Sequence, residues 1–278
     1  MSDNLKRILF ATDGSEYAAG AQRLAIELAK RCGAELNVMT IVLGTQDLEG
    51  VGTHNLRATM EKEAQARLDA VVAIASAAGV ASTTHLVYGD TPEHVIVDTA
   101  DELSADLIVL GRRGKRGLAR FMVGHATAWV AGHATCKVLV VPRAAEMWRS
   151  RILLATDGST HSAAAAAAAT AMARQCDLPV TAVSATTKSH SAERRAEARA
   201  AVDAVEAGLN GAGIACDSVV AEGRPDEVVI ETAAARHADL IVIGSHGRTG
   251  LARLFLGSIS ERVMGQAQCP VLVARAAA

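Results

Sequence analysis

Two segments of the sequence carry glycines at a spacing that suits the binding of phosphate groups. Residues 111–125 read GRRGKRGLARFMVGH, and residues 244–258 read GSHGRTGLARLFLGS. The later segment runs glycine, two residues, glycine, nine residues, and then Gly257 and Ser258. Because glycine has no Cβ, its backbone N–H can approach an anion, and the free N–H groups at a helix start also favour phosphate. The spacing therefore predicts two anion-binding surfaces joined by a loop, which together could wrap a polyphosphate.

An aspartate follows a short apolar run at the start of each half of the sequence. Asp13 lies in RILFATDGS and Asp157 lies in RILLATDGS. A carboxylate in this position could accept hydrogen bonds from ribose hydroxyls or from an exocyclic amine. Asp-Gly-Ser after a strand is also an ordinary turn and helix cap, and glycines after a strand also serve the close packing of a loop on a sheet. The nucleotide interpretation therefore depends on both motifs meeting in one crevice.

Motifs of several enzyme and nucleotide-binding classes are missing from the sequence. It has no Walker A loop, no G-x-G-x-x-G after the first strand, no G-x-S-x-G elbow and no H-E-x-x-H. Asp157 is one carboxylate within range of a phosphate-bound metal, His246 is a conceivable acid or base, and Ser258 is a conceivable acceptor. Without an orienting partner, His246 is expected to be an exposed loop residue. We therefore expect a binding protein with no catalytic residue and no protein-held metal, and keep a slow ATPase or phosphotransferase as the alternative.

Both halves of the chain contain the same unit. Besides the aspartate segments, ADLIVLG at 105–111 returns as ADLIVIG at 238–244. The offset between the copies is 144 residues at the aspartates and 133 at these segments. The second copy has therefore lost residues after its second strand, where the first copy carries an insert at 44–57. The repetition predicts two domains, 1–143 and 150–278.

Within each copy, short Val/Ile/Leu runs alternate with longer alanine-rich helical patterns. Apolar strands without a polar face indicate a parallel sheet with helices on both sides. Each unit is therefore expected to be an α/β domain with a doubly wound parallel five-stranded sheet. The strand order 3-2-1-4-5 is favoured, with ligands at the switch point between strands one and four. In the first copy we expect strands at 7–11, 36–43, 83–88, 106–110 and 137–141, and helices at 16–32, 57–78, 92–103 and 125–133.

The bulk composition argues against several classes of protein. Half of the 278 residues are hydrophobic and the formal net charge is −2, so a disordered chain and a broad nucleic-acid surface are both disfavoured. The first ten residues lack the apolar core of a signal peptide, and the uncharged run from Ala163 to Ala173 is too short to span a membrane. We expect a soluble, cytoplasmic protein whose five scattered cysteines are reduced and buried.

Taken together, these motifs resemble the universal stress protein family, here as a tandem pair of domains. The strand-one aspartate, the turn before the third helix with Pro92 or Pro225, and the pattern Gly-x2-Gly-x9-Gly-Ser carry the resemblance, which covers nearly the whole chain. It implies an adenine-nucleotide alpha-hydrolase-like, Rossmann-like fold and the binding of ATP with Mg²⁺ on its phosphates. It also implies a stress-response sensor or regulator whose two domains pair along the last strand. We further expect a homodimer and a regulatory protein partner, and neither nucleic-acid nor membrane binding.

The resemblance implies which residues contact ATP, and backbone around Val183 or Ile41 is expected to frame the purine. In the second copy the expected contacts and their sequence neighbours are Ala155, Thr156, Asp157, Val183, Ile243, Gly244, His246, Gly247, Arg248, Gly257, Ser258 and Ile259. In the first copy they are Asp13, Ile41, Gly111, Gly114, Gly124 and His125.

The two copies differ at one position of the glycine motif, and we expect the second copy to hold nucleotide more reliably. Where the family has Ser or Thr, the first copy has His125. Its ring is bulkier and could crowd the terminal phosphates, although its backbone N–H remains and a protonated ring would attract them. The basic loop at 112–116 suits a polyphosphate, or is simply a solvated face.

A third interpretation needs no nucleotide. The segments KVLVVPR at 137–143 and PVLVAR at 270–275 are apolar strands that invite pairing between copies or chains, as in a dimerisation scaffold. The insert at 44–57 could fold over the first crevice as a lid, or could bind a partner.

Overall fold

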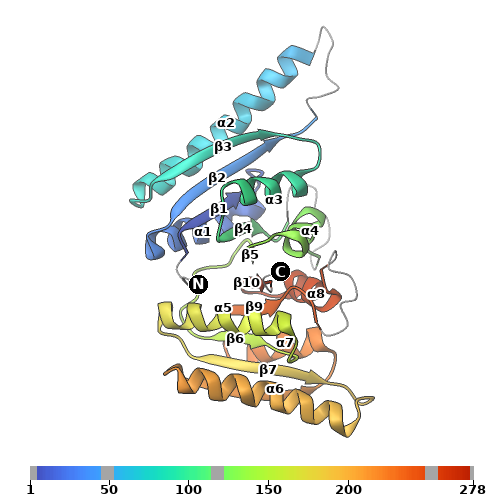
Figure 1. The fold of residues 1–278 in the computed structure, drawn as a ribbon. Coiled ribbons are helices and arrows are strands. Elements are labelled where there is room, and N and C mark those ends of the chain that lie inside the picture. Colours follow the sequence, from blue (N-terminus) through green and yellow to red (C-terminus); the bar gives the residue numbers. More distant parts are fainter. Residues whose placement is uncertain (1–4, 45–52, 114–121, 248–255, 276–278) are drawn as a thin grey trace.

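The computed structural model describes residues 5–44, 53–113, 122–247 and 256–275, which form two similar repeats (Figure 1). The elements of the first repeat are β1 (Arg7–Ala11), the short 3-10 helix η1 (Glu16–Ala18), α1 (Ala19–Cys32), β2 (Glu35–Val42), α2 (Thr53–Ala77), β3 (Ser82–Tyr88), α3 (Pro92–Glu102), β4 (Leu107–Gly111), α4 (His125–His133) and β5 (Lys137–Val141). Those of the second repeat are β6 (Ile152–Ala155), α5 (Thr160–Cys176), β7 (Val180–Thr186), α6 (Ala192–Gly211), β8 (Cys216–Glu222), α7 (Pro225–Ala235), β9 (Leu240–Gly244), α8 (Ser258–Gln266) and β10 (Val271–Ala274).

The strands of both repeats form a single sheet. Its order is β3-β2-β1-β4-β5-β10-β9-β6-β7-β8, so each repeat contributes the predicted order 3-2-1-4-5. Pairing within each repeat is parallel, whereas β5 and β10 pair antiparallel at the centre, with Leu139 opposite Leu272 (Figure 1). The prediction that the two repeats pair along their last strands is therefore confirmed, and the pairing takes place within one chain.

The strands inside the sheet bury both of their faces, whereas the outer strands β3 and β8 are only partly buried. In β1, Ile8 and Phe10 face an apolar layer formed with α1, α2, α5 and α6, and Leu9 faces the opposite layer, formed with α3, α4, α7 and α8. All three side chains are fully buried. Burying one such side chain contributes about 1.5–3 kcal/mol, so the continuous apolar runs follow from a sheet that is covered on both sides.

Helix boundaries follow local backbone chemistry. Pro92 and Pro225 begin α3 and α7, where the missing N–H costs little. Gly33 ends α1 in the left-handed region at φ 62°, and Asp177 ends α5 in the same region at φ 53°. Helix α2 begins at Thr53, whereas the sequence pattern predicted a start at residue 57. None of the helices in the described ranges has an apolar stretch long enough to cross a membrane.

The segment that connects the two repeats is packed against them. Trp148 and Met147 of this segment are buried. From α1, the guanidinium of Arg23 donates to the carbonyl oxygens of Arg143 and Ala145, both at 3.0 Å. The connection is therefore part of the core.

Two arginines tie the repeats together beside the β5–β10 pair. Arg112 follows β4 and donates to the carbonyl oxygen of Ala267 at 2.8 Å. Arg275 follows β10 and donates to the carbonyl oxygen of Gly132 at 2.7 Å. Because Ala267 and Gly132 lie at the ends of α8 and α4, each repeat satisfies helix-end carbonyls of the other.

Gly20→Ala should destabilise the protein, because a Cβ at this position in α1 would lie 2.2 Å from the carbonyl oxygen of Pro142. That neighbour is backbone, so a helix or the connecting segment must shift, and overpacking of this kind costs about 1–3 kcal/mol. The measurement is the free energy of unfolding from urea titration.

Gly208→Ala in α6 is the matched control, since nothing lies within 4 Å of its added Cβ. Alanine is the better helix former by about 0.8–1 kcal/mol, so this variant should be as stable as the wild type or more stable. Equal destabilisation in both variants would contradict the packing described for α1.

Candidate functional site

The turn after β6 places Asp157 at the carboxyl edge of the sheet, beside the end of β9. One carboxylate oxygen, Oδ1, accepts a hydrogen bond from the N–H of Ser159 at 3.0 Å. Gly158 between them has φ 76°, a conformation that favours glycine. Ser159 in turn caps α5, because its Oγ accepts from the N–H of Ser162 at 3.2 Å. The turn-and-cap role of this motif is therefore real, and it uses one oxygen of Asp157.

The second carboxylate oxygen of Asp157 lies against the glycine loop that follows β9. A Cβ placed on Gly247 would lie 3.0 Å from Asp157 Oδ2, so any larger residue at this position would press on the carboxylate. The aspartate of one motif and a glycine of the other thus meet at the predicted switch point. This contact is the condition on which the crevice hypothesis depended.

Tight backbone contacts hold both ends of the glycine loop. A Cβ on Gly244 would lie 2.8 Å from the carbonyl oxygen of His161 in α5. The N–H of Gly257 donates to the carbonyl oxygen of Ser245 at 2.9 Å. The hydroxyl of Ser260 donates to the carbonyl oxygen of Gly244, also at 2.9 Å. These contacts fix the start of α8 against the end of β9. The glycines therefore serve close packing, which is compatible with a role in anion binding.

Helix α8 begins at this edge without a side-chain cap. Its N-cap is Gly257, and no side chain accepts a hydrogen bond there. Ser258 and Ile259 at the first two helical positions are exposed. The first N–H groups of a helix have no partner within the helix, and the helix dipole favours an anion at this end. The arrangement can therefore bind a phosphate group.

His246 is buried, which contradicts the expectation of an exposed loop histidine. The residue is 7% exposed, and its Nδ1 lies 3.0 Å from the hydroxyl of Ser245. Its ring centroid lies 5.0 Å from that of His161, whose Nδ1 is 3.5 Å from the same hydroxyl. The three side chains form a packed polar cluster just after the end of β9. Sequence reasoning missed it because His161 lies on a helix far away along the chain.

The strand register corrects the predicted correspondence of Val183 with Ile41. The threonine that follows each first strand donates its N–H to the carbonyl oxygen of Val183 at 2.9 Å, or of Met39 at 3.0 Å. Val183 is therefore the counterpart of Met39, and Ile41 corresponds to Ala185. Val183 and Met39 are fully buried, whereas Ile41 and Ala185 are half-buried nearer the strand ends. Ala185 is thus better placed than Val183 to contact a base.

The other predicted site residues are either wholly or partly buried at the strand ends or lie outside the described residues. Thr156 at the end of β6 and Ile243 in β9 are buried, and Ala155 is half-buried. Arg248 lies outside the described residues, as does Gly114 of the first repeat. Most of the insert at 44–57, with its predicted lid or partner role, also lies outside them.

An arginine covers the equivalent turn of the first repeat. The N–H of Ser15 donates to Asp13 Oδ1 at 2.9 Å, as in the second repeat. A Cβ on Gly14, however, would lie 2.4 Å from Cδ of Arg67, so the side chain of Arg67 in α2 lies over the turn. Arg67 is held there by an ion pair with Glu63 at 3.0 Å. The space beside this turn is therefore occupied by an arginine side chain.

The start of α4 in the first repeat lies near a carboxylate. Gly124 donates its N–H to the carbonyl oxygen of Arg112 at 2.8 Å, so this loop closes like that of the second repeat, and Gly111 packs against Tyr17. The ring Nε2 of His125 lies 3.3 Å from Oε1 of Glu93 on α3. A phosphate at this helix start would therefore approach a negative charge.

In the second repeat the corresponding acidic residue, Asp226, has two arginine partners. It is 1% exposed, and its carboxylate pairs with Arg224 at 2.8 Å and with Arg262 of α8 at 3.7 Å. A buried carboxylate needs such partners, because an unpaired charge in the interior is costly. Sequence reasoning missed Asp226, although its place directly after Pro225 marks it as a first-turn residue of α7.

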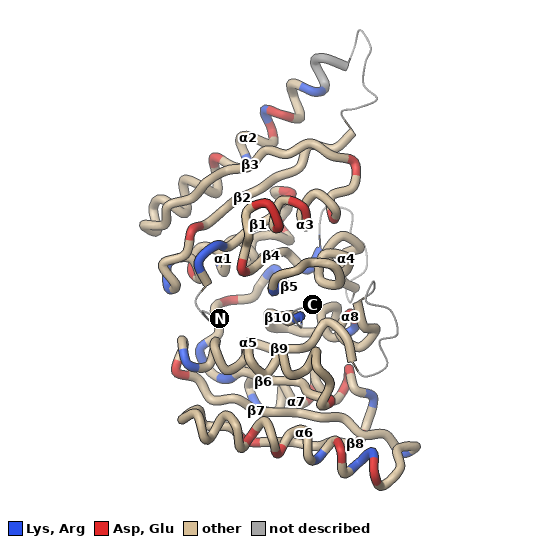
Figure 2. The backbone as a smooth tube through the Cα atoms, in the orientation of Figure 1, with Lys and Arg blue, Asp and Glu red and all other residues tan. Residues whose placement is uncertain are grey.

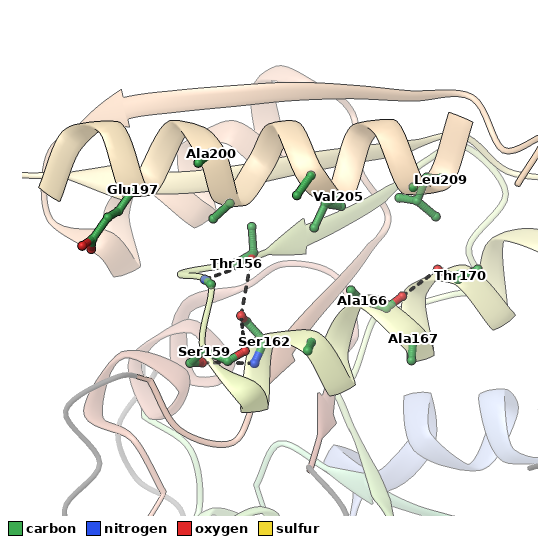
Figure 3. A pocket seen from close by; sticks show the side chains of 15 residues that line it. Thr156, Ser159, Ser162, Ala166, Ala167, Thr170, Glu197, Ala200, Val205 and Leu209 are labelled. Atoms are coloured by element: carbon green, nitrogen blue, oxygen red, sulfur yellow. Dashed lines mark hydrogen bonds between the residues drawn. The ribbon is translucent and has the colours of Figure 1, made fainter. Parts of the chain in front are cut away.

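A cavity of about 640 Å³ opens between α5 and α6 beside the β6 turn (Figure 3). Thr156, Gly158 and Ser159 of the turn line one part of it, and alanines make up half of the residues of the two helices that line the rest. The described residues of the glycine loop do not line it. The cavity therefore adjoins the crevice at the turn but is a separate space.

Small side chains open this cavity in the second repeat. A left-handed glycine follows both α2 and α6, at φ 78° and 79°, and this alignment makes Ala201 the counterpart of Arg67. On the facing helix, Thr170 stands where α1 has Ile26. Most of α5 is uncharged, whereas α6 carries charges of both signs (Figure 2). The two repeats thus share a backbone but differ in how far the space beside the turn is filled.

Comparisons of the sequence with a family profile and with individual proteins point to the same family. The sequence profile of the Universal stress protein family matches residues 4–142 and again residues 149–275. The universal stress protein YxiE of Bacillus subtilis is 34% identical over 145 residues, covering 49% of this chain and 97% of its own length. The universal stress protein MJ0531 of Methanocaldococcus jannaschii is 36% identical over 141 residues, covering 50% of this chain and 82% of its own length.

Solved structures match both repeats at once. The crystal structure of a universal stress protein from Archaeoglobus fulgidus superposes with a TM-score of 0.77 and 19% identity. The match covers 98% of this chain and 96% of that one. The shared fold thus includes both halves of the chain.

Ser159→Ala should lower the free energy of unfolding by about 1 kcal/mol, because the cap from its Oγ to the N–H of Ser162 is lost. Ser15→Ala is the matched control in the first repeat, where the serine makes no cap hydrogen bond and its buried Oγ has no hydrogen-bond partner. The control should stay within about 0.5 kcal/mol of the wild type in urea unfolding. Equal losses in the two variants would show that the caps do not differ as described.

Proposed function

Because the chain belongs to the universal stress protein family, we propose that its second repeat binds ATP at the carboxyl edge between β6 and β9. The observation that carries the proposal is the contact between Asp157 and Gly247, which joins the acidic turn to the glycine loop that leads to α8. Ligands of doubly wound sheets bind at this switch point.

The two sides of the crevice suit the two ends of a nucleotide. The uncapped start of α8 and the hydroxyl of Ser258 offer donors to the phosphates. On the other side, the carboxylate of Asp157 can accept hydrogen bonds from the ribose hydroxyls. Ala185, half-buried near the end of β7, can contact the base. This assignment places the negative phosphates away from β7 and close to the helix dipole.

The second repeat is the better site of the two. In the first repeat Arg67 lies over the turn, and His125 lies beside the carboxylate of Glu93 at the helix start. Their counterparts in the second repeat are Ala201, which lines the cavity beside the turn, and Ser258, which places a hydroxyl at the helix start. The duplication therefore yields one crevice suited to polyphosphate and one that has diverged from it.

Magnesium would enter this site with the nucleotide. Mg²⁺ is commonly bound through substrate phosphates with one or two carboxylates, rather than by a cage of protein ligands. The part of the chain that the structure describes has no group of three His, Cys, Asp or Glu side chains arranged for a metal ion. Asp157 is the carboxylate that faces the glycine loop. The residues of the proposed site therefore fit a metal ion that is held chiefly by the phosphates of the nucleotide.

The proposed role is that of a nucleotide-dependent sensor or regulator in the stress response. A ligand that binds one conformation better shifts the population toward it, which is how occupancy could be read by a protein partner. We do not extend the proposal to hydrolysis, because His246 is packed against Ser245 and His161. A homodimer would have to use a surface other than β5 and β10, since these strands pair with each other.

Asp157→Ala should abolish ATP binding to the second repeat, because the ribose loses its acceptor and the glycine loop loses its facing carboxylate. Titration calorimetry with Mg-ATP on the wild type should give one strong site per chain. At about 100 times its dissociation constant, the nucleotide should stabilise the wild type by about 2.7 kcal/mol, and the variant should lose this gain. Asp13→Ala is the matched control and should keep the strong site. A wild type that shows neither heat nor stabilisation would refute the proposal.

Ser258→His should weaken ATP binding by roughly tenfold or more, because a hydrogen bond to a charged group contributes about 1.5–3 kcal/mol. The substitution installs in the second repeat the residue that the first repeat has at this position. The reciprocal His125→Ser should leave the strong site unchanged. Calorimetric affinities of both variants provide the measurement. If strong binding survives in Ser258→His but is altered by His125→Ser, the nucleotide binds the first repeat, which would contradict the proposal.

A further inference from the structure

A second cavity lies at the junction of the two repeats, where the C-terminal ends of α1 and α5 meet the connecting segment. Its volume is about 270 Å³, and its lining includes Cys32, Cys176, Met147, Met172 and Arg31. Four of these side chains carry sulfur, although the whole chain has only five cysteines and seven methionines. The concentration of two thiols and two thioethers around one small space is a chemical feature that the nucleotide site does not use.

The two thiols come from equivalent positions of the two repeats. Cys32 is the last residue of α1 and Cys176 is the last residue of α5, and both are half-buried. The side-chain amide of Gln175, the residue before Cys176, donates to Sγ of Cys32 with N and S 2.9 Å apart. Burial raises the pKa of the Cys32 thiol, and the nearby Cys176 also raises it. The pairing of the repeats thus brings together thiols that are far apart in sequence.

The thioethers lie beside these thiols. Met172 precedes Cys176 by four residues, so both lie on the same face of α5. Met147 belongs to the connecting segment, and both methionines are buried. In the first repeat, the counterpart of Met172 is Leu28, so the thioether is not a requirement of the helix packing. Thiolate and thioether groups are soft ligands, which among biological metals select Cu(I), zinc and iron–sulfur clusters.

We propose that Cys32, Cys176 and Met172 bind a soft monovalent cation, Cu(I) or Ag(I), at the junction of the two repeats, with Met147 beside it. The bound ion joins one ligand of the first repeat to two of the second. It would therefore stabilise the contact between the repeats by binding the folded chain in preference to the unfolded one. The site does not depend on the proposed nucleotide binding.

Other occupants fit the observations less well. Structural zinc takes four ligands, and no group of three His, Cys, Asp or Glu side chains within the described ranges is arranged to hold a metal. A disulfide between Cys32 and Cys176 would leave the two thioethers that line the same cavity without a role. A soft monovalent cation uses both kinds of sulfur.

Charge and protons balance at this site. Each bound thiol releases its proton to solvent, so two thiolates with one monovalent cation carry a net charge of −1. The guanidinium of Arg31 lines the same cavity and can offset this charge. Its ion pair with Glu27 at 2.8 Å holds it on the surface of α1. The metal keeps its oxidation state, so no electron donor or acceptor is needed.

The remaining cysteines provide internal controls. Burial raises the pKa of Cys136 and Cys269 to about 12 and that of Cys216 to about 11. None of the three lines the cavity at the junction. Cys216 is half-buried like Cys32 and Cys176, so Cys216→Ser is a control of matched exposure.

Competition for Cu(I) between the reduced full chain and a chromogenic Cu(I) chelator, without oxygen, tests the proposal. The wild type and Cys216→Ser should each hold one tightly bound Cu(I) per chain, and Cys32→Ser and Cys176→Ser should each lose it. Met172→Leu installs the first-repeat residue and conserves volume, so it should fold and bind roughly tenfold more weakly. X-ray absorption at the copper edge should show only sulfur neighbours in the wild type.

Two results would overturn the proposal. One is equal Cu(I) binding by the wild type and the Cys32→Ser, Cys176→Ser double variant. The other is a reduced wild type that binds no Cu(I) but forms a Cys32–Cys176 disulfide with peroxide. Circular dichroism checks that each variant is folded. If a serine variant does not fold, Met172→Leu decides the matter, because unchanged affinity in that variant would also contradict the site.

Discussion

The antiparallel pairing of β5 with β10 is the interaction on which the rest of the structure depends. Each repeat taken alone is a five-stranded sheet that ends in an apolar strand, and an unpaired edge of this kind invites association with other chains. Three pairs of Val and Leu residues join the two edges into one sheet. The same pairing lets Arg112 and Arg275 reach helix ends of the opposite repeat, and it sets α1 and α5 around the connecting segment.

Within each repeat, the first strand and its fourth-strand neighbour are followed by helices on opposite faces of the sheet, and this arrangement creates the crevice. Parallel strands end at one edge, so the turn after β6 and the loop after β9 must lie side by side. Two repeats of the same strand order then differ through a few side chains. An arginine covers the turn in the first repeat, whereas alanines line the space beside it in the second. Duplication has therefore kept the fold and allowed the two crevices to diverge.

Much of this architecture could be predicted from the sequence, because apolar runs, first-turn prolines and the internal repeat are local signals. The strand order and the meeting of Asp157 with the glycine loop followed from general rules for parallel sheets. The burial of His246 could not be predicted, since its partner His161 lies on a distant helix. The correspondence of Val183 was wrong because the register depends on backbone pairing that side-chain types do not reveal. The contact of Arg67 with the first turn was likewise set by tertiary packing.

In the complex that we propose, the second crevice holds the phosphates of ATP between the Asp157 turn and the start of α8. A crystal structure of the full chain with Mg²⁺ and a non-hydrolysable ATP analogue tests it most directly. The account predicts nucleotide density in the second repeat, with phosphates at Gly257 and Ser258 and the ribose at Asp157. A crevice filled by its own side chains, or nucleotide bound only in the cavity between α5 and α6, would contradict it.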